Sequence, residues 1–227
     1  MTSIASNLQA VNARIAAAAK ACGRAPGDIA LLAVSKTWPA KCVAEAADAG
    51  QRAFGENYVP EGSDKAAALA DRALAWHFIG PLQSNKTRLV ANAFDWVHSL
   101  DRLKIAERLS AQRDAARPPL NVCLQVNVSG EASKSGVAPD ALAALAQAVS
   151  VLPGMRLRGL MAIPEATDDI ALLKQRFAQV RALRDALNGA GMALDTLSMG
   201  MSHDLEVAIA EGATMVRIGT AIFGARA

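Results

Sequence analysis

The stretch LDTLSMGMSHDLEVAIAEGATMVRIGT, residues 194–220, decides the fold class of this chain. It begins with a β-leaning run at 194–198, passes through a glycine-containing loop into a helical stretch at 204–211, and returns to a β-leaning run at 215–218. Two short apolar runs joined by a helix-length segment are typical of a βαβ unit with parallel strands. The stretch therefore predicts a parallel sheet covered by helices.

The same alternation extends over the rest of the chain. Apolar residues at helical spacing predict a first helix that ends before Gly23, and they are Ile4, Leu8, Val11, Ile15 and Ala19. Strands are then predicted at 29–35, 52–56, 75–79, 95–98, 121–128, 157–161, 194–198 and 215–218. Helices are predicted near 40–49, 61–70, 85–91, 103–115, 139–152, 168–188 and 204–211. Eight strands separated by helices favour a (β/α)8 TIM barrel with an extra N-terminal helix over an open Rossmann-like sheet of five or six strands. The run at 95–98 is the weakest of these strands.

Composition narrows the class of protein. The chain has 227 residues with 52% hydrophobic and 20% charged content, which is typical of a chain with a substantial core, and nothing marks a domain boundary. We expect a single domain over residues 1–227. The longest uncharged stretch, 141–155, is too short and broken to span a bilayer, and the first residues do not read as an export signal. Three widely spaced cysteines fit a reducing compartment, so we expect a cytoplasmic protein.

Charge and aromatic content bear on the partners. A net charge of +3 with 4% aromatic residues gives neither a basic stripe nor a stacking platform, so nucleic acid is not expected as a partner. A small anionic ligand needs far less positive charge.

Strand parity predicts which side chains enter the barrel. In the last strand, Met215, Arg217 and Gly219 share one face, so Arg217 is expected to point inward. An enclosed charge needs partners, and a buried carboxylate is the alternative to a ligand. The predicted strand at 121–128 places polar residues on its inward face, and they are Asn121, Cys123, Gln125 and Asn127.

Two loops have the composition of a phosphate site. Sites in such barrels lie at the C-terminal ends of the strands, and phosphate is often bound after strands seven and eight. The first loop is Ser198-Met199-Gly200-Met201-Ser202 and the second is Gly219-Thr220. Glycine lets the backbone approach an anion, and hydroxyl and N–H groups donate to it. Ser202 has a second interpretation, as the N-cap of the next helix.

The first predicted strand ends in Val34-Ser35-Lys36-Thr37. A lysine shielded by apolar neighbours becomes the neutral amine that attacks a carbonyl, whereas a solvated charge is the ordinary interpretation. An amine after strand one, a phosphate site after strands seven and eight and an inward Arg217 together match a carbonyl-bearing phosphate ester such as pyridoxal phosphate.

Six segments resemble the pyridoxal-phosphate homeostasis proteins, relatives of the alanine racemase N-terminal barrel. They are LLAVSKTWPA, FGENYVPEGSDK, WHFIGPLQSNKTR, SKSGV, LRGLMAIPE and LSMGMSHDLEVAIAEGATMVRIGTAIFGAR, between Leu31 and Arg226. The resemblance implies that Lys36 holds pyridoxal 5′-phosphate (PLP) as a Schiff base, that Arg217 faces the pyridine nitrogen and that Asn57 lies beside the cofactor. It places around the phosphate Ser198, Gly200, Met201, Ser202, Gly219 and Thr220.

The resemblance also implies a function. The family is regarded as non-enzymatic and as storing, buffering or delivering the cofactor, so we expect no catalytic residue, no metal, a monomer, and transient contact with apo-enzymes. A racemase using PLP and a barrel that binds another phosphorylated metabolite are the alternatives. The chain departs from the family at Trp38, where a basic residue is frequent, and at His203, where Asp is frequent. Lys134 matches a family lysine that either serves in transfer or is a solvated loop residue.

Four other residues have less specific interpretations. His77 and His98 fall on predicted strands and are expected to be hydrogen-bonded residues of the core or rim. Glu56 either assists the cofactor or pairs with a rim cation. Tyr58, the only tyrosine, is expected at the rim. Alanine racemases take their second acid–base group, a tyrosine, from a β-domain of the partner subunit. We expect no counterpart of that β-domain in residues 1–227. We therefore expect no substantial racemase activity.

Overall fold

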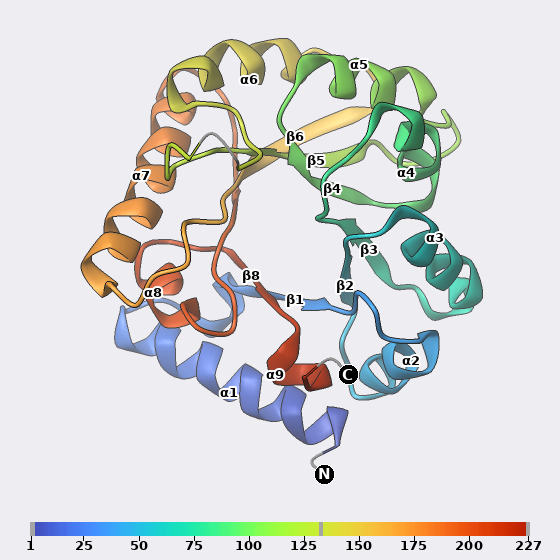
Figure 1. Cartoon of the computed structure of the whole chain (residues 1–227), viewed down its shortest axis with the longest axis vertical. Coiled ribbons are helices and arrows are strands. Elements are labelled where there is room, and N and C mark those ends of the chain that lie inside the picture. Colours follow the sequence, from blue (N-terminus) through green and yellow to red (C-terminus); the bar gives the residue numbers. More distant parts are fainter. Residues whose placement is uncertain (1–2, 132–133, 226–227) are drawn as a thin grey trace.

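The computed structural model describes residues 3–131 and 134–225 and contains a closed barrel of eight parallel strands. Consecutive strands are neighbours around the barrel, and the last strand pairs with the first, with Ala33 opposite Ile218. Figure 1 shows the helices arranged around the outside of the strands. The predicted (β/α)8 barrel is therefore confirmed, and the open sheet is wrong. Ser133 and Arg226, which belong to two of the family motifs, lie outside the described residues.

The bounds of the elements are as follows. The strands are β1 (Ala30–Val34), β2 (Ala53–Glu56), β3 (Ala75–Phe78), β4 (Trp96–Leu100), β5 (Leu120–Gln125), β6 (Met155–Met161), β7 (Thr196–Ser198) and β8 (Met215–Ile218). The α-helices are α1 (Ile4–Ala21), α2 (Ala40–Asp48), α3 (Val59–Ala68), α4 (Thr87–Ala93), α5 (Leu103–Gln112), α6 (Leu142–Ser150), α7 (Ile170–Gly189), α8 (Leu205–Ala210) and α9 (Thr220–Phe223). Short 3₁₀ helices are η1 (Pro26–Asp28), η2 (Ala70–Arg72), η3 (Ser84–Lys86) and η4 (Pro139–Ala141).

Two elements differ from the sequence prediction in an informative way. The strand predicted at 121–128 ends at Gln125, because Val126 forms an isolated bridge with Val137 and the Asn127 N–H donates to the Val137 carbonyl. The loop after β5 thus folds back on the chain instead of extending the barrel. Helix α9 was not predicted, because four residues are too few to show a helical period.

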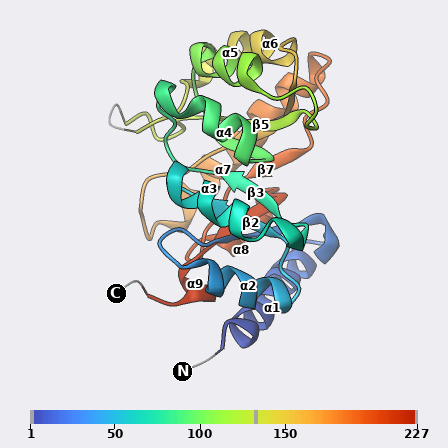
Figure 2. The same ribbon diagram turned by 90° about the vertical axis from the view of Figure 1, so that its right-hand side faces the viewer.

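Helix α1 packs against α8, α9 and α2 on the outside of the barrel. The Ser3 side chain caps it by accepting from the Ser6 N–H at 3.1 Å, and its apolar stripe is buried against α8 and α9. The Asn7 side-chain amide donates to the Ile222 carbonyl of α9 at 2.8 Å. Figures 1 and 2 show α1, α2 and α9 grouped together. This packing fixes α9, which begins within the second predicted phosphate loop, at Thr220.

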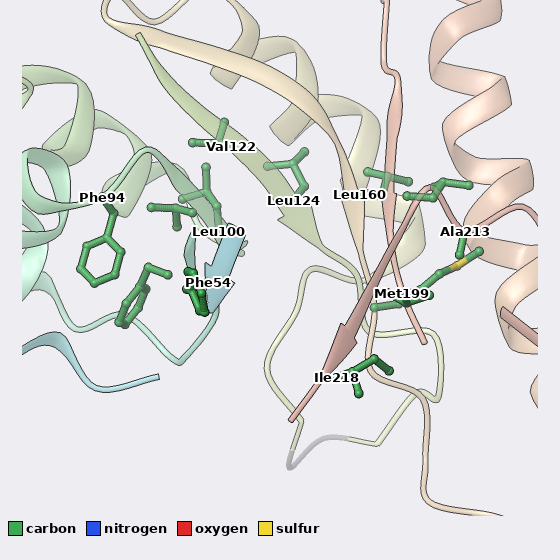
Figure 3. Packing of buried hydrophobic residues seen from close by; sticks show 14 of the residues in the cluster. Phe54, Phe94, Leu100, Val122, Leu124, Leu160, Met199, Ala213 and Ile218 are labelled. Atoms are coloured by element: carbon green, nitrogen blue, oxygen red, sulfur yellow. The ribbon is translucent and has the colours of Figure 1, made fainter. Parts of the chain in front are cut away.

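Hydrophobic side chains fill the space between the strands and the helices. Figure 3 shows part of this cluster, including Phe54, Phe94, Val122, Leu124 and Ile218. These side chains are fully buried, and burying each contributes roughly 1.5–3 kcal/mol. The rigid layer they form holds the strand ends in register. Among the helices of the described residues, none is both long and apolar enough to cross a membrane.

The polar face predicted for residues 121–128 divides between the two ends of the barrel. Asn121 accepts from the Arg158 guanidinium at 3.1 Å, close to where β5 begins, and serves the structure there. Gln125, at the other end of β5, is buried and donates to the Ser135 carbonyl at 3.1 Å. Cys123 is fully buried within β5, and Asn127 lies in the loop beyond it, where its side chain donates to the Glu131 carbonyl at 2.9 Å.

Candidate functional site

A cavity of about 220 Å³ lies at the C-terminal ends of the strands, and its lining residues end or follow β1, β2, β3, β6, β7 and β8. Its wall contains most of the residues that the sequence assigned to the site, namely Lys36, Asn57, Met201, Ser202, Arg217, Gly219 and Thr220. The sequence did not assign Val34, Ile79, Ile163 and His203, which complete the wall. The parity of β1 could have indicated Val34, because it precedes Lys36 by two residues.

Ser198 and Gly200 are not on this wall. Ser198 is fully buried in β7, and its hydroxyl contacts both Arg217 and His98. Gly200 has a φ of +95°, and a Cβ there would lie 2.6 Å from the Cβ of Ala208 in α8. Its carbonyl accepts from the Arg217 N–H at 2.9 Å. Both residues therefore lie beneath the cavity and support Arg217.

Ser202 faces the cavity and does not cap the next helix. The N-cap of α8 is Asp204, whose carboxylate accepts from the Met201 N–H at 2.5 Å. This bond holds the loop of residues 199–203 in place. The capping interpretation of Ser202 is therefore wrong, and its side chain lines the cavity wall.

Arg217 lies in the cavity wall with its side chain pointing into the barrel, as strand parity predicted. Its Nη1 donates to the Ser198 carbonyl at 2.5 Å and to the Ser198 hydroxyl at 2.9 Å, and its Nη2 donates to the Ala162 carbonyl at 2.9 Å. Burial lowers the pKa of Arg217 to about 10, so the guanidinium remains charged at neutral pH. The alternative of a buried carboxylate is wrong, because these acceptors are neutral and no ion pair joins Arg217 to a described carboxylate.

A chain of hydrogen bonds runs from Arg217 across the inside of the barrel. The Ser198 hydroxyl lies 2.8 Å from His98 Nδ1, and His98 Nε2 lies 2.9 Å from His77 Nδ1. Because arginine only donates, the Ser198 hydroxyl accepts from it and can donate its own proton to His98, which then donates to His77. The sequence predicted hydrogen-bonded histidines in the core or at the rim, and the structure places both in the core. It did not indicate the chain, because its members come from different strands.

Burial keeps both histidines neutral. It lowers the pKa of His77 to about 3 and that of His98 well below the ordinary value, the latter also through the charge of Arg217. The ring of His77 stacks on Trp96 with centroids 5.2 Å apart. The histidines are thus fixed dipoles behind Arg217 and not acids or bases at neutral pH.

Glu56 pairs with a cation, but with one that comes from α3 and not from the rim. Its Oε1 accepts from the Ser35 hydroxyl at 2.6 Å and from Lys65 Nζ at 2.7 Å. Its Oε2 is buried without a hydrogen-bond partner among the described residues, and burial raises the pKa of this carboxyl. Glu56 is not part of the cavity wall.

The loop after β1 places Lys36 in the wall. Lys36 is half-buried, and Trp38 stacks on Phe223 of α9 with centroids 6.1 Å apart. The residue that departs from the family pattern at position 38 therefore joins this loop to α9, and α9 begins with Thr220 of the second predicted phosphate loop.

Asn57 has unused hydrogen-bonding capacity inside the wall. Its Oδ1 is buried, and no described residue provides it with a partner. A Cβ at Gly80 would lie 2.2 Å from the Asn57 carbonyl oxygen, so the backbone at residue 57 is tightly packed from the other side. A buried unpaired polar atom at a cavity is a position where a ligand can supply the missing bond.

The charges in the wall favour an anion. Arg217 is cationic, Ser202 and Thr220 carry hydroxyl groups, and no described residue of the wall is a carboxylate. Apolar side chains provide the remaining surface, chiefly Val34, Ile79 and Ile163. The cavity therefore suits a small ligand that combines an anionic group with an apolar ring. No group of three or more potential metal ligands is found within the described part of the chain.

Two neighbouring hollows share Asn57 with the cavity. One, of about 240 Å³, contains Gln125 and Lys134, whose Nζ lies 3.1 Å from a Glu131 carboxylate oxygen. The other, of about 400 Å³, contains Tyr58, which is 55% exposed and lies at the rim as predicted. A larger hollow of about 530 Å³ lies apart from these, between α3 and α4.

Comparison with known proteins gives concordant similarities. Residues 6–227 match the family described as alanine racemase, N-terminal domain. The pyridoxal phosphate homeostasis protein of Pseudomonas aeruginosa is 65% identical over 226 residues, which cover 100% of this chain and 97% of that protein. The structure of PipY from Synechococcus elongatus with PLP bound is 39% identical with a TM-score of 0.86, covering 97% of this chain and 100% of that one. Alanine racemase from Corynebacterium glutamicum shares the fold alone, at 16% identity and a TM-score of 0.70 over 96% of this chain and 61% of that one.

Proposed function

The chain belongs to the pyridoxal phosphate homeostasis protein family, and from that premise we propose that it binds PLP as a Schiff base on Lys36 and stores, buffers or delivers it. The observation that carries the proposal is the cavity that brings Lys36, Arg217 and two hydroxyl side chains to one small space. The PLP bound to the PipY relative supports it from outside the chain.

The residues of the wall fit this cofactor. Ser202 and Thr220 provide hydroxyl donors for the phosphate, with Met201 and Gly219 beside them. A Cβ at Gly219 would already lie 3.1 Å from the Val34 carbonyl oxygen, so a small residue keeps this side of the cavity open. Ser198 and Gly200 contribute indirectly, because they hold Arg217.

Asn57 and Arg217 fit the ring of the cofactor. The buried Asn57 Oδ1 has no described partner and lies in a wall that is otherwise apolar around Val34 and Ile79. Arg217 supplies a permanent cation whose position is set by three hydrogen bonds to neutral oxygens. When bound, PLP supplies a carbonyl that reacts with amines and a ring that withdraws electrons.

Arg217 favours retention of the cofactor over catalysis. With a pKa of about 10 it stays protonated, so beside a bound PLP it would act as a donor to the pyridine nitrogen and would leave that nitrogen without a proton. A ring in this state withdraws electrons weakly, which makes carbanion chemistry slow. We therefore propose a protein that binds the cofactor without turning over a substrate.

The racemase alternative has one observation in its favour. His203 lies on the cavity wall with Lys36, so two side chains able to transfer a proton face the same space. Racemisation needs such a group on each face of the substrate carbon. Tyr58, by contrast, lies in the neighbouring hollow and is largely exposed.

Equilibrium dialysis with three ligands tests the proposed function. PLP has a phosphate and an aldehyde, pyridoxal lacks the phosphate, and pyridoxine 5′-phosphate lacks the aldehyde. We expect PLP to bind at least tenfold more tightly than either of the others, because only PLP uses both Lys36 and the phosphate loops. Equal binding of PLP and pyridoxine 5′-phosphate would instead identify a site for phosphorylated metabolites in general.

A further inference from the structure

The loop that carries Lys36 is held by the side chain of a buried lysine on α3. Lys65 is 5% exposed, and its Nζ donates to the Ser35 carbonyl at 2.8 Å, to Glu56 Oε1 at 2.7 Å and to Glu61 Oε1 at 2.6 Å. An ammonium group has three N–H donors, and each has an acceptor here. One of these acceptors is the backbone immediately before Lys36.

Glu61 holds the backbone on the other side of Lys36. Its Oε1 accepts from the Thr37 N–H at 2.5 Å as well as from Lys65. Thr37 has a φ of +70°, a left-handed conformation that costs energy for a β-branched residue. The hydrogen bond that the Thr37 N–H donates to the Glu61 carboxylate stabilises the strained turn.

The hydrogen bonds of Lys65 and Glu61 hold the backbone beside Lys36 more than they stabilise the barrel. Strand β1 is already paired with β2 and β8 through its backbone, and its residues Leu32 and Ala33 are fully buried. A buried ion pair adds little stability over apolar side chains of similar size, because both charges must be desolvated. The side chain of Lys65 bonds to Glu56, to Glu61 and to the Ser35 carbonyl, and that of Glu61 accepts from the Thr37 N–H. Ser35 and Thr37 are the residues that flank Lys36.

We propose that Lys65 and Glu61 are positioning residues that hold the turn of residues 35–37 in the one conformation that keeps the Lys36 amine in the cavity wall. This proposal rests on the proposed function for its cofactor readout. A second readout, the mobility of the turn, is independent of any ligand.

Glu61→Ala is the central variant of the test. Its side chain is 28% exposed and the Glu56–Lys65 pair remains, so the barrel is expected to fold. Glu61→Gln retains an acceptor oxygen for the Thr37 N–H. Glu211→Ala is the matched control, because Glu211 is also a partly exposed glutamate in an ion pair, with Arg181 at 3.0 Å, and does not touch the turn.

Three measurements are made on each variant: amide hydrogen exchange of residues 35–38 without ligand, the dissociation constant for PLP, and thermal unfolding. In Glu61→Ala we expect amide exchange at Thr37 to be about tenfold faster and PLP to bind about tenfold more weakly. This is the factor that a lost hydrogen bond of roughly 1.4 kcal/mol produces. We expect Glu61→Gln to recover most of both effects, and Glu211→Ala to show neither at a similar melting temperature.

The double variant Glu56→Gln, Lys65→Met tests Lys65 without leaving a buried carboxylate unpaired. It frees the Ser35 carbonyl and is expected to accelerate exchange in the same turn. A folded Glu61→Ala protein with protected exchange at Thr37 and unchanged PLP binding would overturn the proposal. Fast exchange in Glu61→Ala together with a wild-type protein that does not bind PLP would instead refute the proposed function and leave the positioning of the turn intact.

Discussion

Gly200 and Gly219 occupy loops that the sequence treats alike, but their backbones face different neighbours. The left-handed φ of Gly200 and the 2.6 Å approach to Ala208 tie it to the packing of α8. Gly219 has a negative φ of −117° and lies on the cavity wall. The sequence predicts that both surround the phosphate, and in the structure Gly219 lines the cavity whereas Gly200 packs against α8.

Alanine substitutions are expected to separate the two glycines. Gly200→Ala should lower the free energy of unfolding by about 1–3 kcal/mol, because it combines a strained φ with a clash against α8. Gly219→Ala should cost less stability and weaken PLP binding more, because its Cβ narrows the cavity near Val34. Urea unfolding and PLP titration of both variants check this, and the opposite ranking in both assays would contradict it.

Proton exchange on an amino acid tests whether the two ionisable side chains near the cofactor act as a catalytic pair. We expect PLP-loaded protein to exchange the α-proton of L-alanine in deuterated water no faster than free PLP does, because protonated Arg217 leaves the ring a weak electron acceptor. Nuclear magnetic resonance follows the exchange, and chiral chromatography follows D-alanine. Steady turnover that is lost in both Lys36→Ala and His203→Ala would make the protein a racemase.

At the scale of elements, β3, β4, β7 and β8 each contribute one member of the chain His77, His98, Ser198 and Arg217. The chain crosses the barrel interior and fixes the proton positions of two neutral histidines. Because burial lowers the pKa of both histidines, neither gains a proton in the folded state until the pH is low.

This predicts how stability depends on pH. The unfolded chain binds protons at both histidines near pH 6.5 and the folded chain does not, so stability is lost as the pH falls below 6.5. For His77 the loss extends down to about pH 3. Each histidine adds a slope of about 1.4 kcal/mol per pH unit. Urea unfolding between pH 7 and pH 5 measures this slope, and His77→Leu should reduce it. An unchanged slope in that variant would show that other groups cause the dependence.

Helix α3 shows why part of the site could not be predicted. The residues that α3 buries, Val59, Gly62 and Lys65, are spaced by three and share one face, which is the signal that could have placed Lys65 inside. A lysine four residues after a glutamate is ordinarily a solvated surface pair, and this motif hid its contact with the Lys36 turn. Long-range contacts between a helix and a loop have no local signature in the sequence.

At the scale of the whole molecule, the alternation of apolar periods predicted the closed barrel. The strand at Met215–Ile218 was predicted with its full bounds, because Gly219 ends it and the apolar alternation is regular. The position of the cavity followed from the rule that barrel sites lie at the C-terminal strand ends. The roles of Ser198 and Gly200 did not follow, since a loop sequence does not say which of its residues face the ligand and which face the barrel.

The central claim is that Lys36 is the residue that holds PLP, and reductive labelling tests it most directly. PLP-loaded protein is treated with borohydride, digested, and analysed by mass spectrometry for the peptide that carries the pyridoxyl group. We expect the label on Lys36, the loss of the visible absorption band on reduction, and neither in a folded Lys36→Ala variant. Lys134→Ala, the matched lysine control, should label as the wild type does. A label on Lys134 or another lysine, or a reducible band that persists in Lys36→Ala, would contradict the account.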